Sequence, residues 1–126
     1  MIQDKNFLNR RLKEIAAMLN NQIGSFPDNS LGLTEADIDQ QIYTATGLSK
    51  SDYLSMDDAK LEATIAEYDE GSGILLLDFL GNLFFYHYQL TKEQSFLIKA
   101  KEFYARFQEK SGTFSMVYFQ RMQWQS

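Results

Sequence analysis

The chain has no cysteine, one proline and one histidine among its 126 residues. The missing cysteines exclude disulfide bonds, thiolate catalysis and thiolate-bound zinc. His87 is the only imidazole for a Ser-His-Asp triad, and a zinc site would need carboxylates around that one ring. One proline and seven glycines leave little that would interrupt helices, so long structureless segments are not expected.

Motifs that bind nucleotides or activate a nucleophile are also missing from the sequence. It contains no G-x-x-x-x-G-K-[ST], no G-x-G-x-x-G and no G-x-S-x-G. The acidic pairs, Asp57-Asp58 and the group around Glu67, Asp69 and Glu70, fit solvated helix ends, where negative charge complements the helix dipole. We therefore predict no catalytic residue, no metal site, no cofactor and no enzymatic activity.

The net charge of −5 is unevenly distributed along the chain. Residues 24–73 hold eleven acidic and two basic side chains, whereas residues 1–23 and 74–126 each carry a small basic excess. An acidic segment of this size is a poor surface for a phosphate backbone, so nucleic-acid binding is disfavoured. The distribution predicts that the basic ends of the chain lie near its acidic middle.

The most apolar stretch, Ile74–Tyr88, is too short to cross a membrane. A membrane-spanning helix needs about 20 predominantly apolar residues, and this stretch contains Asp78 and is followed by Gln89, Thr91 and Lys92. The first fifteen residues carry six charged side chains and no apolar core of a signal peptide. The sequence therefore predicts no membrane association and a cytoplasmic location.

Helical periodicity dominates the whole chain, and no run of strand alternation is convincing. It predicts an all-α fold: a single-domain helical bundle of about six or seven helices over residues 1–126. Residues 1–71 would form N-terminal helices with the acidic middle, and 72–126 an aromatic-rich antiparallel hairpin with a capping helix. In the N-terminal part we predict a helix at 4–23, a loop at 24–33, a helix from the cap Thr34 to Gly47 and a turn opened by Ser49 or Ser51. A helix at 56–69 capped by Ser55 and a hinge at 69–73 follow. The C-terminal part consists of the apolar helix, a helix opened by a capping box of Thr91 and Gln94, and a last helix capped by Ser115.

On a helical wheel the apolar helix is almost uniformly hydrophobic, which is typical of a central core helix. Asp78, Asn82 and Gln89 form a narrow polar stripe, and Phe85 falls in the same stripe. Phe85 is therefore predicted to be exposed, as a partner anchor or as a single surface aromatic. His87 falls on the opposite, deep side, as a buried ring bonded to a carbonyl or Tyr hydroxyl or as a titrating, ligand-binding group.

The last third of the chain contains thirteen aromatic residues. Phe119 and Trp124 are on a short terminal helix together with methionines and Arg121, the residue types enriched in protein–protein interfaces. Two interpretations stay open at this point. The terminal helix either binds a partner or only caps the hairpin before it.

Residues 77–107 resemble a tetratricopeptide helix pair. Leu80-Gly81 with Phe84 matches the first-helix positions, and Ala100-x3-Tyr104 those of the second, although a Leu replaces the leading Trp, the connection is longer and no closing Pro follows. The chain as a whole is similar to an uncharacterised family of short bacterial all-helical proteins, a domain of unknown function. The shared pattern is an opening "MIQDKNFLNRRLKEIAAML"-like helix, an acidic middle and a closing "KSGTFSMVYFQRM"-like segment. The resemblance implies a helical domain with a tetratricopeptide-like C-terminal half and a binding role.

Two functional hypotheses follow from these observations. The first is a non-enzymatic protein–protein interaction module, binding a protein partner or itself as a homodimer, with Phe85, Phe119 and Trp124 as its surface. The alternative is a small-ligand binder with a pocket for apolar or aromatic molecules near His87, Tyr88 and Tyr104.

Overall fold

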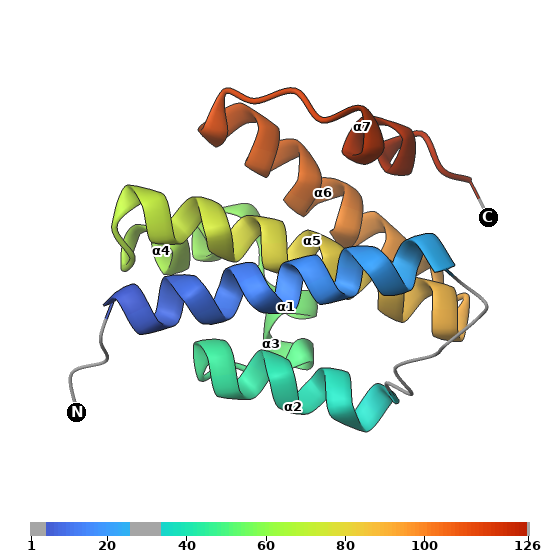
Figure 1. Ribbon diagram of the computed structural model, residues 1–126, viewed down its shortest axis with the longest axis horizontal. Coiled ribbons are helices and arrows are strands. Elements are labelled where there is room, and N and C mark those ends of the chain that lie inside the picture. Colours follow the sequence, from blue (N-terminus) through green and yellow to red (C-terminus); the bar gives the residue numbers. More distant parts are fainter. Residues whose placement is uncertain (1–4, 26–33, 126) are drawn as a thin grey trace.

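The computed structural model describes residues 5–25 and 34–125, all side chains included except those of residues 5–8 and 35. Seven helices and no strand occur in these residues, which confirms the predicted all-α domain. The helices are α1 Lys5–Ser25, α2 Glu35–Thr46, α3 Lys50–Ser55, α4 Asp58–Ala66, α5 Glu70–Thr91, α6 Gln94–Ser111 and α7 Met116–Met122 (Figure 1). Helix α1 continues past the predicted stop at Gly24; residue 4 and residues 26–33 of the predicted loop lie outside the described residues.

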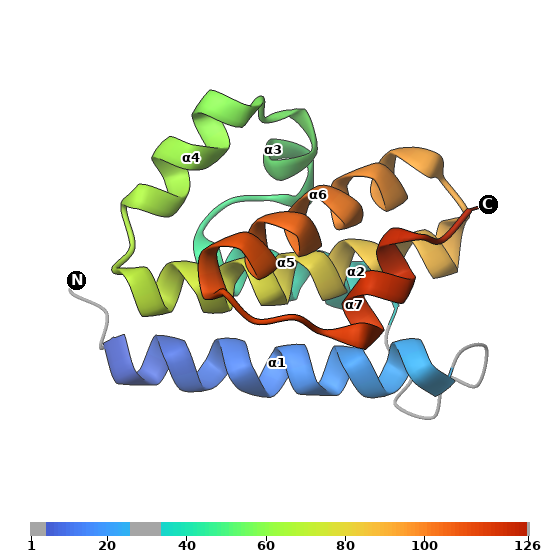
Figure 2. The same ribbon diagram turned by 90° about the horizontal axis from the view of Figure 1, so that it is seen from above.

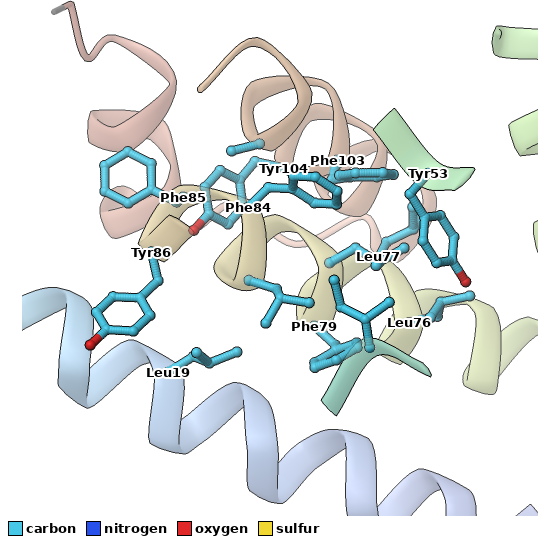
Figure 3. Packing of buried hydrophobic residues seen from close by; sticks show 14 of the residues in the cluster. Leu19, Tyr53, Leu76, Leu77, Phe79, Phe84, Phe85, Tyr86, Phe103 and Tyr104 are labelled. Atoms are coloured by element: carbon cyan, nitrogen blue, oxygen red, sulfur yellow. The ribbon is translucent and has the colours of Figure 1, made fainter. Parts of the chain in front are cut away.

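Helix α5 is the centre of the fold. Fifteen of its 22 residues are buried, because α1, α2, α4 and α6 all pack against it. Its Leu77, Phe79 and Phe84 lie among the side chains of neighbouring helices (Figure 3). The apolar stretch is thus a core helix, as predicted. Among the described residues, no helix combines the length and hydropathy of a membrane span.

Helices α1 and α5 run side by side and in the same direction (Figures 1 and 2). Three polar side chains of α5 reach α1 along this contact. Ser72 Oγ donates to Asn9 Oδ1 at 2.7 Å, Asn82 Nδ2 to the Ala16 carbonyl at 3.5 Å, and Gln89 Nε2 to the Ile23 carbonyl at 3.3 Å. The polar stripe of the helical wheel therefore faces α1 rather than solvent.

Helix α6 folds back antiparallel to α5 (Figure 2). The turn between them places Lys92 in the left-handed region, at φ 64°. Gly81 of α5 leaves the space that the Tyr104 ring occupies, since a Cβ at position 81 would lie 2.7 Å from Tyr104 Cδ1. Ala100 is fully buried in the same contact. The hairpin is therefore closely packed, while its likeness to tetratricopeptide repeats stays a prediction.

Two capping predictions are confirmed in the N-terminal half. Thr34 caps α2 in a reciprocal box with Asp37, and Gly47 ends that helix at φ 77°. Ser49 caps α3 in the same way with Asp52. Ser115 likewise caps α7 through the backbone N–H of Tyr118, as predicted.

Three other predicted boundaries are wrong. Asp57, not Ser55, caps α4, and its carboxylate accepts from the Lys60 N–H at 2.8 Å. The predicted hinge at 69–73 is the first turn of α5, where the Asp69 carboxylate caps the Ser72 N–H. The predicted capping box of Thr91 and Gln94 does not form, because α5 continues to Thr91. Where several neighbouring residues could each cap a helix, the packing of the folded chain determines which of them becomes the N-cap.

The acidic middle meets the basic last third between α4 and α6. Arg106 pairs with Asp58 and with Glu62, and Lys110 Nζ lies 3.4 Å from Glu62 Oε2. This contact confirms the predicted proximity of these two segments. The carboxylates are exposed, so the pairs contribute about 0–1 kcal/mol each.

Candidate functional site

Helix α7 and the residues around it expose the densest group of large apolar side chains in the described part of the chain. We call this group the C-terminal surface. Its exposed fractions range from 41% for Phe119 to 64% for Phe114. The members are Phe114, Met116, Val117, Phe119 and Trp124. Contiguous exposed apolar groups of this kind typically mark interaction sites.

The inner side of α7 is held by polar contacts. Its two buried residues are Tyr118 and Arg121. Arg121 Nη1 lies 2.8 Å from Asn20 Oδ1, 3.0 Å from Asn82 Oδ1 and 3.0 Å from the Tyr104 hydroxyl. The guanidinium also lies 5.5 Å from the centroid of the Tyr118 ring, within the range of cation–π attraction. One arginine of α7 thus reaches α1, α5 and α6 together.

Asn82 is the hub of these contacts, although it is fully buried in the centre of the apolar helix. Its Oδ1 accepts from Tyr104 at 2.9 Å and from Arg121. Its Nδ2 donates to the Tyr118 hydroxyl at 3.1 Å and to the Ala16 carbonyl. All four hydrogen-bonding positions of the amide are used. The six residues Asn20, Asp78, Asn82, Tyr104, Tyr118 and Arg121 are called the Asn82 cluster below.

The cluster contains one carboxyl group, Asp78, whose Oδ1 accepts a hydrogen bond from Tyr118. Burial raises the pKa of Asp78 above its usual value, while the Tyr118 hydroxyl and the Arg121 charge oppose this shift. Burial and the neighbouring Asp78 raise the pKa of Tyr118 to about 12. The Tyr118 hydroxyl therefore stays protonated at neutral pH and donates a hydrogen bond to Asp78.

We predict that Asp78→Asn becomes more stable relative to the natural chain as pH rises. The raised pKa means that the folded state holds the Asp78 proton more tightly than the unfolded state does. The stability contributed by the protonated form is complete below the unfolded pKa and is lost as pH rises through the folded pKa. Asparagine keeps an acceptor for Tyr118 without the charge. Urea unfolding of both proteins from about pH 3 to 8 measures the difference; a difference independent of pH would contradict the prediction.

The predicted exposure of Phe85 is wrong, because its side chain is only 1% exposed. Its ring lies edge-on to Trp124 at 5.6 Å, beside Tyr104 at 6.3 Å, and 5.5 Å from the Arg121 guanidinium. The stripe that contains Phe85 is covered by α1 and α7, which bring complementary polar groups. Phe119 and Trp124 are partly exposed, and the buried ring of Phe85 packs against the Trp124 ring.

The other three predicted site residues lie in different surroundings. His87 lies edge-on to Phe96 with the ring centroids 4.3 Å apart, and its Nε2 is 2.9 Å from Lys50 Nζ. Tyr88 contacts Phe85, and Tyr104 stacks on Tyr118 at 4.4 Å. None of the three lines the grooves described below.

His87 is buried, as predicted, and its Nε2 lies 2.9 Å from the ammonium of Lys50. The Lys50 ammonium has only donors, so Nε2 is the acceptor in this contact. Lys50 also lies 3.4 Å from Asp39. A lysine from the acidic middle thus connects α2, α3 and α5.

Two grooves flank α7, and Val117 and Arg121 line both of them. One has a volume of about 590 Å³, lies between α1, α6 and the segment before α7, and includes Phe107; we call it the Phe107 groove. The other has a volume of about 370 Å³, lies between the ends of α1 and α5 and helix α7, and includes Trp124; we call it the Trp124 groove. Sequence patterns did not predict either groove, because each combines segments far apart in the chain.

The described residues contain no group of three or more His, Asp or Glu side chains arranged to hold a metal ion. Comparison of the chain with protein-family models, with curated proteins and with solved structures finds no match in any of the three. The geometry around α7 therefore carries the functional interpretation.

Proposed function

We propose that the protein is a non-enzymatic interaction module that forms a homodimer through the C-terminal surface. The observation that carries this proposal is the sharp division of α7. Tyr118 and Arg121 fix its inner side, while Met116, Val117 and Phe119 point outward and are about half exposed. A helix that only capped the hairpin would direct its apolar side chains inward and its polar ones outward.

The proximity of an apolar projection and a groove supports a second copy of this chain as the partner. The ring centroids of Phe114 and Phe119 lie 5.7 Å apart, and the chain neighbours of these two residues, Thr113, Ser115 and Tyr118, line the Phe107 groove. A two-fold dimer needs a surface that is complementary to itself, which such a pair provides. The five side chains offer roughly 500 Å², less than the 800 Å² or so that each partner buries in a standard interface. The contact would therefore extend into the groove.

Phe119→Ser tests the homodimer, and Tyr43→Ser is the matched control. Tyr43 is 63% exposed and lies on α2. We expect sedimentation equilibrium to give twice the chain mass for the natural protein and for Tyr43→Ser. Phe119→Ser is expected to weaken the dimer about 30-fold, the effect of losing a hot-spot aromatic.

A monomer at every concentration up to about 100 μM would contradict the homodimer. Native mass spectrometry of the protein purified from its own cells then distinguishes the other partner. If the protein forms a complex with a different polypeptide and Phe119→Ser abolishes that complex, the protein is still an interaction module, but its partner is that polypeptide and not a second copy. We propose that the module acts in the cytoplasm. We also propose that it binds no nucleic acid, which the acidic middle of the chain supports.

A further inference from the structure

We propose that the Trp124 groove binds a small organic anion: a carboxylate with a neighbouring N–H or O–H donor and an apolar or aromatic body. This site goes beyond the proposed dimer and does not depend on it. The inference rests on three features of the groove, namely its cations, a buried acceptor and its aromatic wall.

Two cationic side chains line the groove, although the net charge of the chain is −5. They are Arg121 and Lys92, and none of the described residues that line the groove is an Asp or Glu. Nη1 makes all the hydrogen bonds of the Arg121 guanidinium in the described residues. The N–H groups of its Nε and Nη2 therefore donate to no described residue, and a guanidinium with two such donors can bind a carboxylate through both oxygens. Asp78, the acid whose pKa the Arg121 charge acts to lower, lines the Phe107 groove and is not among the lining residues of the Trp124 groove.

A residue that lines the groove carries an acceptor that lacks a donor. This residue, Gln89, is 7% exposed. The Nε2 atom of Gln89 donates to the Ile23 carbonyl at 3.3 Å, which fixes the orientation of the amide. Its Oε1 is buried and accepts no hydrogen bond from any described residue. A buried acceptor without a donor is unfavourable, so an N–H or O–H of a ligand would satisfy it.

The wall of the groove selects the body of the ligand. Phe85 and Trp124 lie at 89° to each other with the ring centroids 5.6 Å apart, and Ile23 and Val117 complete the apolar lining. A volume of about 370 Å³ is in the usual range for a small-molecule site. An N-acyl amino acid with an apolar side chain has the carboxylate, the adjacent N–H and the apolar body. The end of a polypeptide chain has the same chemistry.

Trp124 is the only tryptophan of the chain, so its fluorescence reports on the groove directly. The probes are N-acetyl-L-phenylalanine, its amide, which lacks the carboxylate, and 3-phenylpropanoate, which lacks the N–H donor. We expect the acid to shift the Trp124 emission saturably, and the amide and 3-phenylpropanoate to bind about 10-fold more weakly. An acetylated tetrapeptide ending in Phe distinguishes the two sources: tighter binding than N-acetyl-L-phenylalanine indicates a polypeptide end, and weaker binding a free small molecule.

Two substitutions assign the contacts without disturbing Arg121, which also holds α7. Lys92→Asn removes a charge, and asparagine tolerates the left-handed backbone at this position. It is expected to weaken binding of the acid about 5-fold and to leave the amide unaffected. Gln89→Leu is expected to weaken N-acetyl-L-phenylalanine but not 3-phenylpropanoate. Lys60→Asn, an exposed cation on α4, is the control and should change nothing.

The experiment is run on the Phe119→Ser variant, so that self-association neither helps nor hinders it. Fluorescence and calorimetric titrations that show no binding up to about 10 mM of any probe would overturn the site. Equal affinity for the acid and the amide would overturn its preference for anions. Unchanged binding of N-acetyl-L-phenylalanine by Gln89→Leu would overturn the role of the buried acceptor.

Discussion

Replacing Asn82 with leucine should lower the free energy of unfolding by about 3–5 kcal/mol. Leucine has the same branched shape and number of side-chain heavy atoms and is no smaller, so the loss comes from the polar contacts and not from a cavity. The Asn82 amide has four hydrogen-bond partners: Tyr104, Tyr118, Arg121 and the Ala16 carbonyl. Without it the buried Arg121 charge keeps fewer acceptors, and the Tyr118 hydroxyl loses a donor. Urea unfolding followed by circular dichroism measures the change.

Ser72→Ala is the matched control for Asn82→Leu. Ser72 is also buried on α5 and faces α1, but its side chain makes a single hydrogen bond, to Asn9. Its loss should amount to about 1 kcal/mol. A double-mutant cycle with Arg121→Met should show that the two changes together destabilise less than their sum, because the unpaired charge is gone. Additive effects, or a loss below about 1 kcal/mol for Asn82→Leu, would show that the cluster is not coupled.

The second large effect is expected at Gly81. Even a Cβ there would lie 2.7 Å from Tyr104 Cδ1 and 2.8 Å from Tyr104 Cε1. The ring has little freedom to retreat, since it stacks on Tyr118 at 4.4 Å and its hydroxyl is bonded to Asn82 and Arg121. Gly81→Ala should therefore destabilise by about 1–2 kcal/mol and Gly81→Val by about 3 kcal/mol.

Gly24 provides the comparison for Gly81, because it is also helical and a Cβ there would meet nothing within 4 Å. Gly24→Ala should stabilise the protein by up to about 1 kcal/mol through helix propensity alone. Thermal or urea unfolding of the three variants separates the steric effect from the propensity effect. If Gly81→Val unfolded like the natural chain, the close approach of α5 and the Tyr104 ring would not exist in solution.

The helices were predictable because their signals are local. The apolar helix, the box at Thr34 and the cap at Ser115 each depend on residues within a few positions, whereas the turn predicted at Ser49 or Ser51 is a helix that Ser49 caps. The errors at Ser55 and Thr91 also have a local origin, since neighbouring residues compete to start a helix. Sequence periodicity gives the type of an element more reliably than its first residue.

The candidate site was only partly predictable, because its contacts join distant parts of the chain. Phe119 is exposed on the short terminal helix, whereas Trp124 is exposed two residues beyond the end of α7 at Met122, so the prediction that this helix includes Trp124 is wrong. Phe85 was misplaced because a helical wheel shows which side is polar but not what covers that side. Arg121 reads as an ordinary surface arginine, although it is only 8% exposed and bonds to Asn20, 101 positions earlier. The one sequence feature that indicated a buried polar partner was the pair Asp78 and Asn82, which are polar residues inside an apolar helix.

The hydrogen bonds between α1 and α5 set the register of the two helices. Hydrophobic packing alone discriminates poorly between rotations of a helix that is apolar almost all round. The α1 partners Asn9, Ala16 and Ile23 are seven residues apart, as are Asn82 and Gln89 on α5. A slip by one residue would misplace these contacts together and leave buried amides without partners. Besides their contribution to stability, the polar groups in the core therefore specify one alignment of two apolar surfaces that could otherwise pack in several.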